Sequence, residues 1–334
     1  MKVLVTGGNG FIGSNFILYL QKTNPELEII NLDANLIGSN KKNLLNLKNP
    51  DKYQFIEGNI NDKSLLEKII PSVDGIINFA AESHVDRSII DARPFLESNI
   101  MGVYNLLDTI RFINPKCKFL QISTDEVFGS LEKQFAKEDD IFKPSNPYSA
   151  SKASAEMIVE SYKKTYDLNI LITRCTNNFG PFQFPEKVIP KTIIRAQRNM
   201  KIPVYGSGNN VRDWLYVGDH CKAIFNVFLN GKNGNSYNIS GNNELTNIQL
   251  IKKILELLGK SENLIYYVED RPGHDFRYGI DSSKIRNYLG WKPEYTFEEG
   301  LKNTIDWYVK NSDWWRQIAT EEMLEPTPWK KYHK

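Results

Sequence analysis

A glycine loop between an apolar strand and an apolar helix constrains the fold of this chain more than any other feature. Residues 6–13 read TGGNGFIG, follow the apolar run of residues 2–6 and open a helical pattern. The loop fits a phosphate-binding fingerprint in two registers, Gly8, Gly10 and Gly13 or Gly7, Gly10 and Gly13. The missing side chains permit a tight turn and a close approach to a pyrophosphate, and the helix N-terminus supplies N–H groups and positive potential. The pattern predicts a dinucleotide-binding site.

Short apolar strands alternate with helical patterns through the first half of the chain. The predicted strands after the first are residues 28–32, 54–57, 75–79, 118–123 and 169–174, and the clearest helices are residues 99–112 and 149–166. This alternation is typical of an α/β fold in which crossover helices join parallel strands. We therefore expect a doubly wound Rossmann sheet, built by residues 1–175.

The composition changes after residue 175, where loops rich in Asn, Gly, Pro and aromatic residues replace the regular alternation. Residues 247–258, with Thr246 as a cap, and residues 297–308 are predicted helices of this part. We expect residues 176–334 to form mainly a smaller α/β substrate-binding domain, with part of the chain returning to the first domain.

Composition argues against several kinds of partner. Forty-two Lys and Arg balance 40 Asp and Glu, so the net charge of +2 gives no reason to expect nucleic acid or a membrane surface. No stretch approaches the roughly 20 apolar residues of a membrane span, and no secretory leader is recognisable. The three cysteines, Cys117, Cys175 and Cys221, fit neither a disulfide framework nor a metal cluster. We expect a cytoplasmic globular protein without a bound metal.

Asp33 stands 20 residues after Gly13, at the end of the second predicted strand. A carboxylate there can accept both hydroxyls of an adenosine ribose and would repel a 2′-phosphate. The position favours NAD over NADP, although Lys41 and Lys42 nearby keep NADP open.

Tyr148 and Lys152 lie four residues apart at the start of a predicted helix, so they share one face. A tyrosine with an ordinary pKa of about 10 is a poor base at neutral pH, but a nearby ammonium and the positive ring of NAD favour the phenolate. The pair predicts removal of a proton and a hydride from an alcohol. Without the glycine loop, an ordinary surface helix would explain the pair about as well.

Thr124, Asp125 and Glu126 follow the apolar strand of residues 118–123, so their side chains reach the carboxyl end of a sheet strand, where ligands bind in such folds. Two neighbouring carboxylates can have different environments, one ionised as a base and one protonated as an acid. Acids at a helix start are the commoner explanation of an isolated Asp-Glu pair, but this position favours catalysis. Alcohol oxidation alone does not need them, so we expect an elimination as well.

Further motifs lie along the whole chain. They are AAESHVDRS at residues 80–88, STDEV at 123–127, NNFGP at 177–181, PEK at 185–187, RDW at 212–214 and DRPGHD at 270–275. Together with the glycine loop, Tyr148 and Lys152, they resemble the extended short-chain dehydrogenase/reductase family. Within that family the likeness is to the nucleotide-sugar 4,6-dehydratases, above all those that act on dTDP-glucose.

The resemblance implies conversion of dTDP-glucose to dTDP-4-dehydro-6-deoxyglucose and water. Tyr148 would take the proton of the C4 hydroxyl while a tightly bound NAD accepts the C4 hydride. Glu126 would then remove the C5 proton while Asp125 protonates the leaving C6 hydroxyl, and the hydride would return to C6. Thr124 would hydrogen-bond the C4 oxygen, and Lys152 would also hold the nicotinamide ribose.

The same resemblance assigns the binding residues. NAD would contact Gly7, Gly10, Phe11, Ile12, Gly13, Asp33, Asn59, Ile60, Ala80, Ala81, Ser83, Ser98, Tyr148, Lys152 and Asn178. The nucleotide sugar would contact Ser83, Thr124, Asn177, Lys187, Val188, Pro203, Tyr205, Arg212, Asn247, Arg271 and His274. Arg212 and Lys187 would meet the diphosphate, which suits the paired donors of a guanidinium. His84 receives no role, because a hydrogen-bonded structural histidine is the commoner case.

Some positions depart from the family, and other functions stay open. Ala34 and Asn59 stand where the family usually has a lysine or similar residue and an aspartate near the adenosine, and segment 129–146 is shorter than in many bacterial members. The alternatives are the same dehydration of UDP-glucose, a nucleotide-sugar C4 epimerase, and an NAD-binding regulatory protein. The resemblance also implies a homodimer, for which helices 99–112 and 149–166 are candidate contacts.

Overall fold

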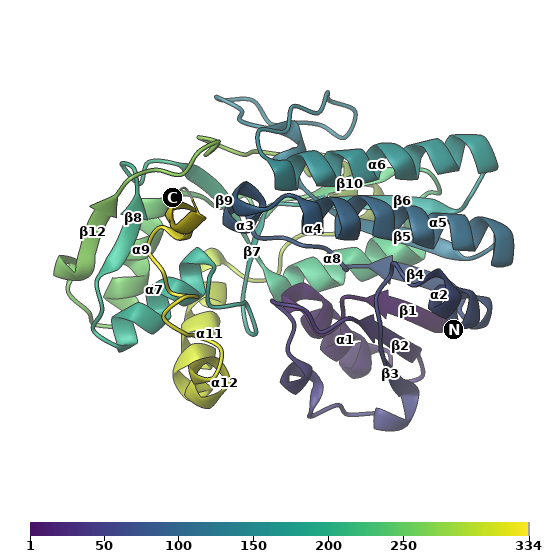
Figure 1. Ribbon diagram of the computed structural model, residues 1–334, viewed down its shortest axis with the longest axis horizontal. Helices are drawn as coiled ribbons and strands as arrows, with labels where there is room; N and C mark the ends of the chain where they lie inside the picture. Colours follow the sequence, from purple (N-terminus) through teal and green to yellow (C-terminus); the bar gives the residue numbers. More distant parts are fainter. Residues whose placement is uncertain (333–334) are drawn as a thin grey trace.

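A seven-stranded parallel sheet forms the centre of the larger half of the molecule (Figure 1). The computed structural model describes residues 1–332. The strand order is β10-β6-β5-β4-β1-β2-β3, and every neighbouring pair is parallel. The strands are β1 (Lys2–Thr6), β2 (Glu28–Asp33), β3 (Tyr53–Glu57), β4 (Gly75–Asn78), β5 (Lys118–Thr124), β6 (Ile170–Cys175) and β10 (Ser236–Ile239). The order reverses between β1 and β4, which is where such sheets bind ligands.

Helices cover both faces of this sheet, whose strands are apolar on both sides. One face carries α1 (Phe11–Thr23), α8 (Val217–Asn230) and α10 (Ser283–Leu289), and the other carries α2 (Lys63–Ile69), α5 (Gly102–Ile113) and α6 (Pro147–Tyr166). Between β4 and α5 the chain forms α3 (Val85–Ile90), α4 (Arg93–Phe95) and the π-helical η4 (Leu96–Met101).

The second half of the chain builds a smaller lobe beside the sheet, on the left of Figure 1. Its strands are β7 (Asn177–Phe179), β9 (Val211–Tyr216) and β11 (Glu244–Thr246), which form one sheet, and the parallel pair β8 (Ile202–Tyr205) and β12 (Ile265–Val268). Its helices are α7 (Val188–Gln197), α9 (Asn247–Leu257), α11 (Phe297–Lys310) and α12 (Ser312–Arg316). Single 3₁₀ turns are η1 (Lys41–Leu44), η2 (Pro50–Lys52), η3 (Ile70–Ser72), η5 (Asp125–Phe128), η6 (Glu262–Leu264) and η7 (Pro328–Tyr332).

The predicted α/β class and all six predicted strands are confirmed, each strand to within one residue at either end. The predicted helix at residues 99–112 is wrong in its first turn, because η4 is π-helical and α5 begins only at Gly102. Asn99 explains the wider turn: its side chain bonds the backbone N–H and carbonyl of Glu82 and the hydroxyl of Ser151. The division of the chain at residue 175 stays a prediction, although β10 joins the large sheet.

Among residues 1–332, no helix combines the length and the apolar composition needed to cross a membrane.

Candidate active site

A cavity of about 300 Å³ opens at the carboxyl ends of the central strands, where the strand order reverses between β1 and β4. The loops after β1, β2, β4, β5 and β6 all contribute lining residues. Parallel strands end at the same edge of a sheet, so motifs far apart in the sequence meet here. We call this space the cofactor cavity.

The glycine loop forms one wall of the cofactor cavity, and the structure selects its register. Gly7 has a φ of +69°, and a Cβ built on it would lie 2.7 Å from the backbone nitrogen of Ala80. A Cβ on Gly13 would overlap the carbonyl oxygen of Gly7. A Cβ on Gly8 would instead meet Asn31, and Gly8 does not line the cavity. The structure therefore favours the register Gly7, Gly10 and Gly13, whose predicted role is to form a pyrophosphate cradle.

Asp33 ends β2 with its carboxylate buried at the cavity edge. One oxygen accepts from the backbone N–H of Asn35 at 2.7 Å and the hydroxyl of Ser39 at 2.9 Å, and the other accepts from the N–H of Asn9 at 2.9 Å. These donors fix the carboxylate and leave acceptor capacity mainly on its second oxygen. The group fits one ribose hydroxyl directly, and its charge disfavours a 2′-phosphate.

Asp125 and Glu126 begin η5 directly after β5 and line the cofactor cavity from different environments. Asp125 is buried, and burial together with the negative charge of Glu126 raises its pKa well above the ordinary value. Its Oδ1 lies 3.1 Å from the hydroxyl of Thr124. Glu126 is partly exposed and accepts a hydrogen bond from the hydroxyl of Tyr278 at 3.3 Å. The pair thus has the asymmetry that a general acid and a general base require.

Tyr148 and Lys152 lie in the first turns of α6, on its buried side. Burial lowers the pKa of Lys152 to about 8, and its Nζ donates to the carbonyl of Ile122 at 2.7 Å. Burial raises the pKa of Tyr148 well above its ordinary value, and Glu126 adds to the effect. The predicted lowering by Lys152 is therefore not seen in this state, because desolvation dominates and the ammonium is directed to a backbone carbonyl. A further positive charge in the cavity would oppose this rise.

A second cavity of about 170 Å³ lies between the large sheet and the smaller lobe, and we call it the nucleotide cavity. The residues that line both cavities are His84, Glu126, Asn177, Glu186 and Lys187, so the two spaces adjoin. Its walls combine apolar side chains of α7, β8 and α9 with the cations Lys187, Arg212 and Arg271. This combination suits a nucleoside and its phosphates.

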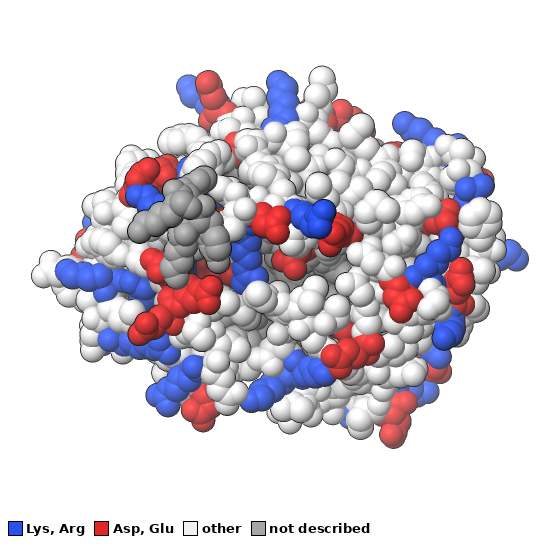
Figure 2. All heavy atoms as spheres, viewed as in Figure 1, with Lys and Arg blue, Asp and Glu red and all other residues white. Residues whose placement is uncertain are grey.

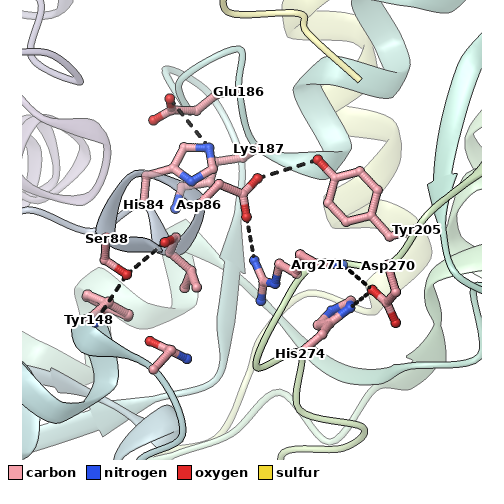
Figure 3. A network of polar contacts seen from close by, with 12 residues as sticks. His84, Asp86, Ser88, Tyr148, Glu186, Lys187, Tyr205, Asp270, Arg271 and His274 are labelled. Atoms are coloured by element: carbon pink, nitrogen blue, oxygen red, sulfur yellow. Dashed lines mark hydrogen bonds and ion pairs between the residues drawn. The ribbon is translucent and has the colours of Figure 1, made fainter. Parts of the chain in front are cut away.

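The cations of the nucleotide cavity are held by contacts within the protein, and Figure 3 shows the one between Arg271 and Asp86. Lys187 Nζ donates to the carbonyl of Ser83 at 2.9 Å, and burial lowers the pKa of Lys187. Arg271 Nη1 donates to Asp86 at 3.0 Å. The guanidinium of Arg212 stacks over the ring of Tyr278, 4.3 Å from its centroid, and donates to the carbonyl of Asp275. The positive charges are thus in place before any phosphate arrives.

The structure places in one of the two cavities every residue that the resemblance assigned to catalysis, to NAD or to the nucleotide sugar. All predicted cofactor contacts and the catalytic set Thr124, Asp125, Glu126, Tyr148 and Lys152 line the cofactor cavity. Val188, Pro203, Tyr205, Arg212, Asn247, Arg271 and His274 line the nucleotide cavity, and Asn177 and Lys187 line both. Their individual roles stay predictions.

Sequence reasoning missed several residues of the site. Asp86 and Glu186 fall inside the quoted motifs but received no role, although the structure directs both toward the cavities. Tyr278 lies three residues beyond the motif at 270–275 and could have been found only from its contacts with Arg212 and Glu126. His220, which bonds Asn178 at 2.8 Å, lies on α8 and carries no signal in the sequence.

His84 lies between the two cavities with its Nε2 3.4 Å from Glu186. Burial, followed by nearby cations, lowers the pKa of His84 well below its ordinary value, so the ring is neutral at pH 7. Residues 1–332 contain no cluster of three or more His, Cys, Asp or Glu side chains able to hold a metal ion.

Charges of both signs are spread over the face shown in Figure 2, without a large patch of one sign. A near-zero net charge with this distribution does not indicate a binding surface for a polyanion.

Comparison with known proteins identifies the family. The family model described as GDP-mannose 4,6 dehydratase matches residues 4–304. A low-salt glycan biosynthesis protein of Haloferax volcanii is 48% identical over 313 residues, which cover 94% of this chain and 100% of that protein. The chain belongs to the nucleotide-sugar 4,6-dehydratase family. The family resemblance drawn from the sequence motifs is therefore confirmed.

Solved structures of 4,6-dehydratases resemble the chain throughout its length. The dTDP-glucose 4,6-dehydratase of Bacillus anthracis, in complex with NAD, is 45% identical, with a TM-score of 0.89 and coverage of 95% of this chain and 99% of that one. The dTDP-glucose 4,6-dehydratase of Streptomyces venezuelae, with NAD and TDP bound, is 40% identical, with a TM-score of 0.93 and coverage of 95% and 100%. Both are similar to this 4,6-dehydratase family member across both lobes.

Proposed function

We propose that the protein is an NAD-dependent hydro-lyase that converts dTDP-glucose to dTDP-4-dehydro-6-deoxyglucose and water. The observation that carries this proposal is the convergence of Tyr148 with the unlike carboxyl groups of Asp125 and Glu126 in one cavity. Oxidation of an alcohol needs one base, which Tyr148 supplies. A second acid and base at the same place serve an elimination.

The residues present fit NAD. Gly7 and Gly13 have no side chain at positions where a Cβ would collide with neighbouring backbone, so the loop can turn tightly beside the cavity. The N-terminus of α1 faces the cavity, and Asp33 offers a carboxylate oxygen for the ribose. Lys152 and Asn178 would hold the nicotinamide end. When bound, NAD would accept the hydride removed at C4 and would return it to C6 after water has left, while C5 regains a proton, so that the cofactor is regenerated.

The acid and base steps follow from the protein groups. Tyr148 accepts the proton of the C4 hydroxyl, whose oxygen also bonds Thr124, and a C4 ketone results. The ketone acidifies the C5 proton, which Glu126 removes. Burial raises the pKa of Asp125 and favours its protonated form, and Asp125 gives this proton to the C6 hydroxyl, which leaves as water.

The nucleotide cavity supports a nucleoside diphosphate as the remainder of the substrate. Lys187, Arg212 and Arg271 supply the positive charge for two phosphates, and Pro203, Tyr205 and Asn247 would frame the nucleoside. Thymine differs from uracil by one methyl group, which is worth roughly 1–3 kcal/mol in a fitted pocket.

The test is parallel incubation of the purified protein with dTDP-glucose and UDP-glucose, followed by mass spectrometry for loss of one water. Faster loss of water from dTDP-glucose supports the proposal. Faster loss of water from UDP-glucose would contradict the assignment of dTDP as the nucleotide of the substrate. An unchanged mass together with a galactose-type proton NMR spectrum would identify a C4 epimerase, and no change in mass or NMR spectrum with either sugar would contradict the activity.

A homodimer in the cytoplasm is part of the same proposal. The outer face of α5 and α6 exposes Tyr104, Phe112, Met157 and Tyr166, which are unusual side chains for a solvated surface. Three free cysteines fit a reducing compartment. Size-exclusion chromatography with light scattering would give the mass of the protein in solution. The mass of a single chain would contradict the homodimer.

A further inference from the structure

Residues 83–88 lie between the cofactor cavity and the nucleotide cavity and make polar contacts with both lobes (Figure 3). They follow β4 and include the first residues of α3, and residues 83–87 line one or both cavities. Five of these contacts cross to the second half of the chain: Ser83 with Lys187, His84 and Arg87 with Glu186, and Asp86 with Arg271 and Tyr205. A displacement of side chains in the nucleotide cavity can therefore reach this segment through these contacts.

Asp86 is the member that faces the nucleotide cavity most directly. Asp86 is 2% exposed, and its carboxylate accepts from Arg271 Nη1 at 3.0 Å and from the hydroxyl of Tyr205 at 3.4 Å. The Nε of Arg271 is buried and has no hydrogen-bond partner among residues 1–332. A phosphate that bonds Arg271 would therefore share the guanidinium with Asp86.

Ser88, in the same helix, contacts the catalytic residue Tyr148. Its Oγ accepts from the backbone N–H of Tyr148 at 3.3 Å and donates to the carbonyl of Val85 at 2.7 Å. That N–H belongs to the first turn of α6 and has no partner within the helix. Val85 packs with Tyr148 and Phe95 in one small buried cluster. Helix α3 thus holds both the backbone and the side chain of Tyr148.

Asp86 and Ser88 are two residues apart in α3, so their side chains leave the helix on nearly opposite sides. Both residues belong to the same short helix, α3, so a shift of one along the helix is passed to the other through its backbone. We propose that Asp86 is a positioning residue, which through α3 and Ser88 places Tyr148 for removal of the C4 hydroxyl proton when Arg271 engages the substrate diphosphate. The proposal rests on the proposed function, because it assigns to Tyr148 its role as the base.

The test compares Asp86→Asn and Ser88→Ala with the double variant in purified protein with NAD. The readouts are the affinity for dTDP by calorimetry, kcat and KM with dTDP-glucose, and the isotope effect on kcat from deuterium at C4. We expect Asp86→Asn to weaken dTDP binding about tenfold and to lower kcat about tenfold, each equivalent to roughly 1.4 kcal/mol. Ser88→Ala should lower kcat to a similar extent with dTDP affinity unchanged. Both should enlarge the C4 isotope effect, because the Tyr148-dependent step becomes slower.

The double variant measures the coupling itself. If α3 transmits the effect, its kcat should fall no further than that of either single variant, whereas independent sites would multiply the two losses. Asp108→Asn is the matched control, since Asp108 is also buried and also accepts from a cation, Lys63, and a tyrosine hydroxyl, Tyr162, but lies on α5 outside both cavities. It should behave as wild type.

The positioning role would be overturned if Asp86→Asn bound dTDP more weakly but kept the kcat and the C4 isotope effect of the wild type. If Asp86→Asn does not fold, Ser88→Ala still tests the proposal, because this change removes only a hydroxyl. A wild-type kcat in Ser88→Ala would also overturn the positioning role. Absence of turnover by the wild type would contradict the proposed function and with it this role. Turnover by the wild type with undiminished kcat in the variants would contradict the role alone.

Discussion

Asp125 and Glu126 are adjacent in the chain, yet one carboxyl group is buried beside the Thr124 hydroxyl and the other reaches the Tyr278 hydroxyl at 3.3 Å from a partly exposed position. The turn of η5 produces this separation directly after β5. Burial and the neighbouring negative charge raise the pKa of Asp125 and favour its protonated form, which suits it to donate a proton while Glu126 accepts one.

Glu126→Gln should abolish dehydration while leaving NAD bound. An amide cannot accept the C5 proton, and loss of a general base costs about 10²- to 10⁴-fold in rate. Formation of the C6 methyl group, followed by NMR, measures the loss, and the NAD content of the purified variant measures cofactor retention. Glu132→Gln, an exposed position in the loop after η5, is the control. Wild-type turnover in Glu126→Gln would refute the assignment of the base.

Gly7→Ala should weaken NAD binding and destabilise the fold more than the left-handed backbone alone explains. Gly259→Ala is the matched control, because Gly259 has a φ of +61° but no atom within 4 Å of the place where a Cβ would stand, whereas a Cβ on Gly7 meets the backbone of Ala80. The control should lose only about 1–2 kcal/mol. Thermal unfolding and NAD titration of both variants measure the difference. Equal losses would show that the close approach at Gly7 has no consequence.

Lys152→Met should inactivate the enzyme and stabilise the NAD-free protein at pH 7. The folded-state pKa of about 8 lies below the ordinary 10.5, so protonated Lys152 costs folding free energy below pH 8. Between pH 8 and 10.5 the unfolded chain binds more protons than the folded one, and wild-type stability rises with pH. The advantage of the variant, at most about 3 kcal/mol from 1.4 kcal/mol per pKa unit, should shrink over this window. Denaturant unfolding at pH 7 and pH 10 measures it, and an advantage that grows with pH would contradict the buried ammonium.

Glu156→Gln should destabilise the protein by about 3–5 kcal/mol, because it leaves Arg174 as a buried charge without its carboxylate. The two side chains are 1% and 4% exposed, and Arg174 Nη2 lies 2.7 Å from Glu156. Glu160→Gln, one turn further along α6, removes a pair that is about one-third exposed and should change stability by less than about 1 kcal/mol. Denaturant unfolding compares them, and equal effects would mean that burial of the Glu156 pair is unimportant.

The sequence was sufficient for the parts of the fold that local patterns encode. Apolar runs between glycine-rich turns marked the six strands of the first half, and Tyr148 to Lys152 followed a proline that starts α6. The motifs also nominated both cavities, since residues at the carboxyl ends of parallel strands necessarily meet.

Long-range contacts escaped prediction for a physical reason. The π-helical η4 depends on Asn99 bonding the backbone of Glu82, and the direction of the Lys152 ammonium depends on the carbonyl of Ile122. The link between Asp86 and Arg271 spans 185 residues. None of these contacts leaves a periodic or compositional signal, because each depends on how distant segments pack.

Incubation of the wild-type protein with dTDP-glucose in heavy water tests the central claim most directly. Proton NMR should show a new C6 methyl signal without splitting from C5, because the C5 proton removed by Glu126 is replaced by deuterium from the solvent. A methyl signal that keeps its C5 splitting, or a sugar that never gains a methyl group, would contradict elimination by Asp125 and Glu126.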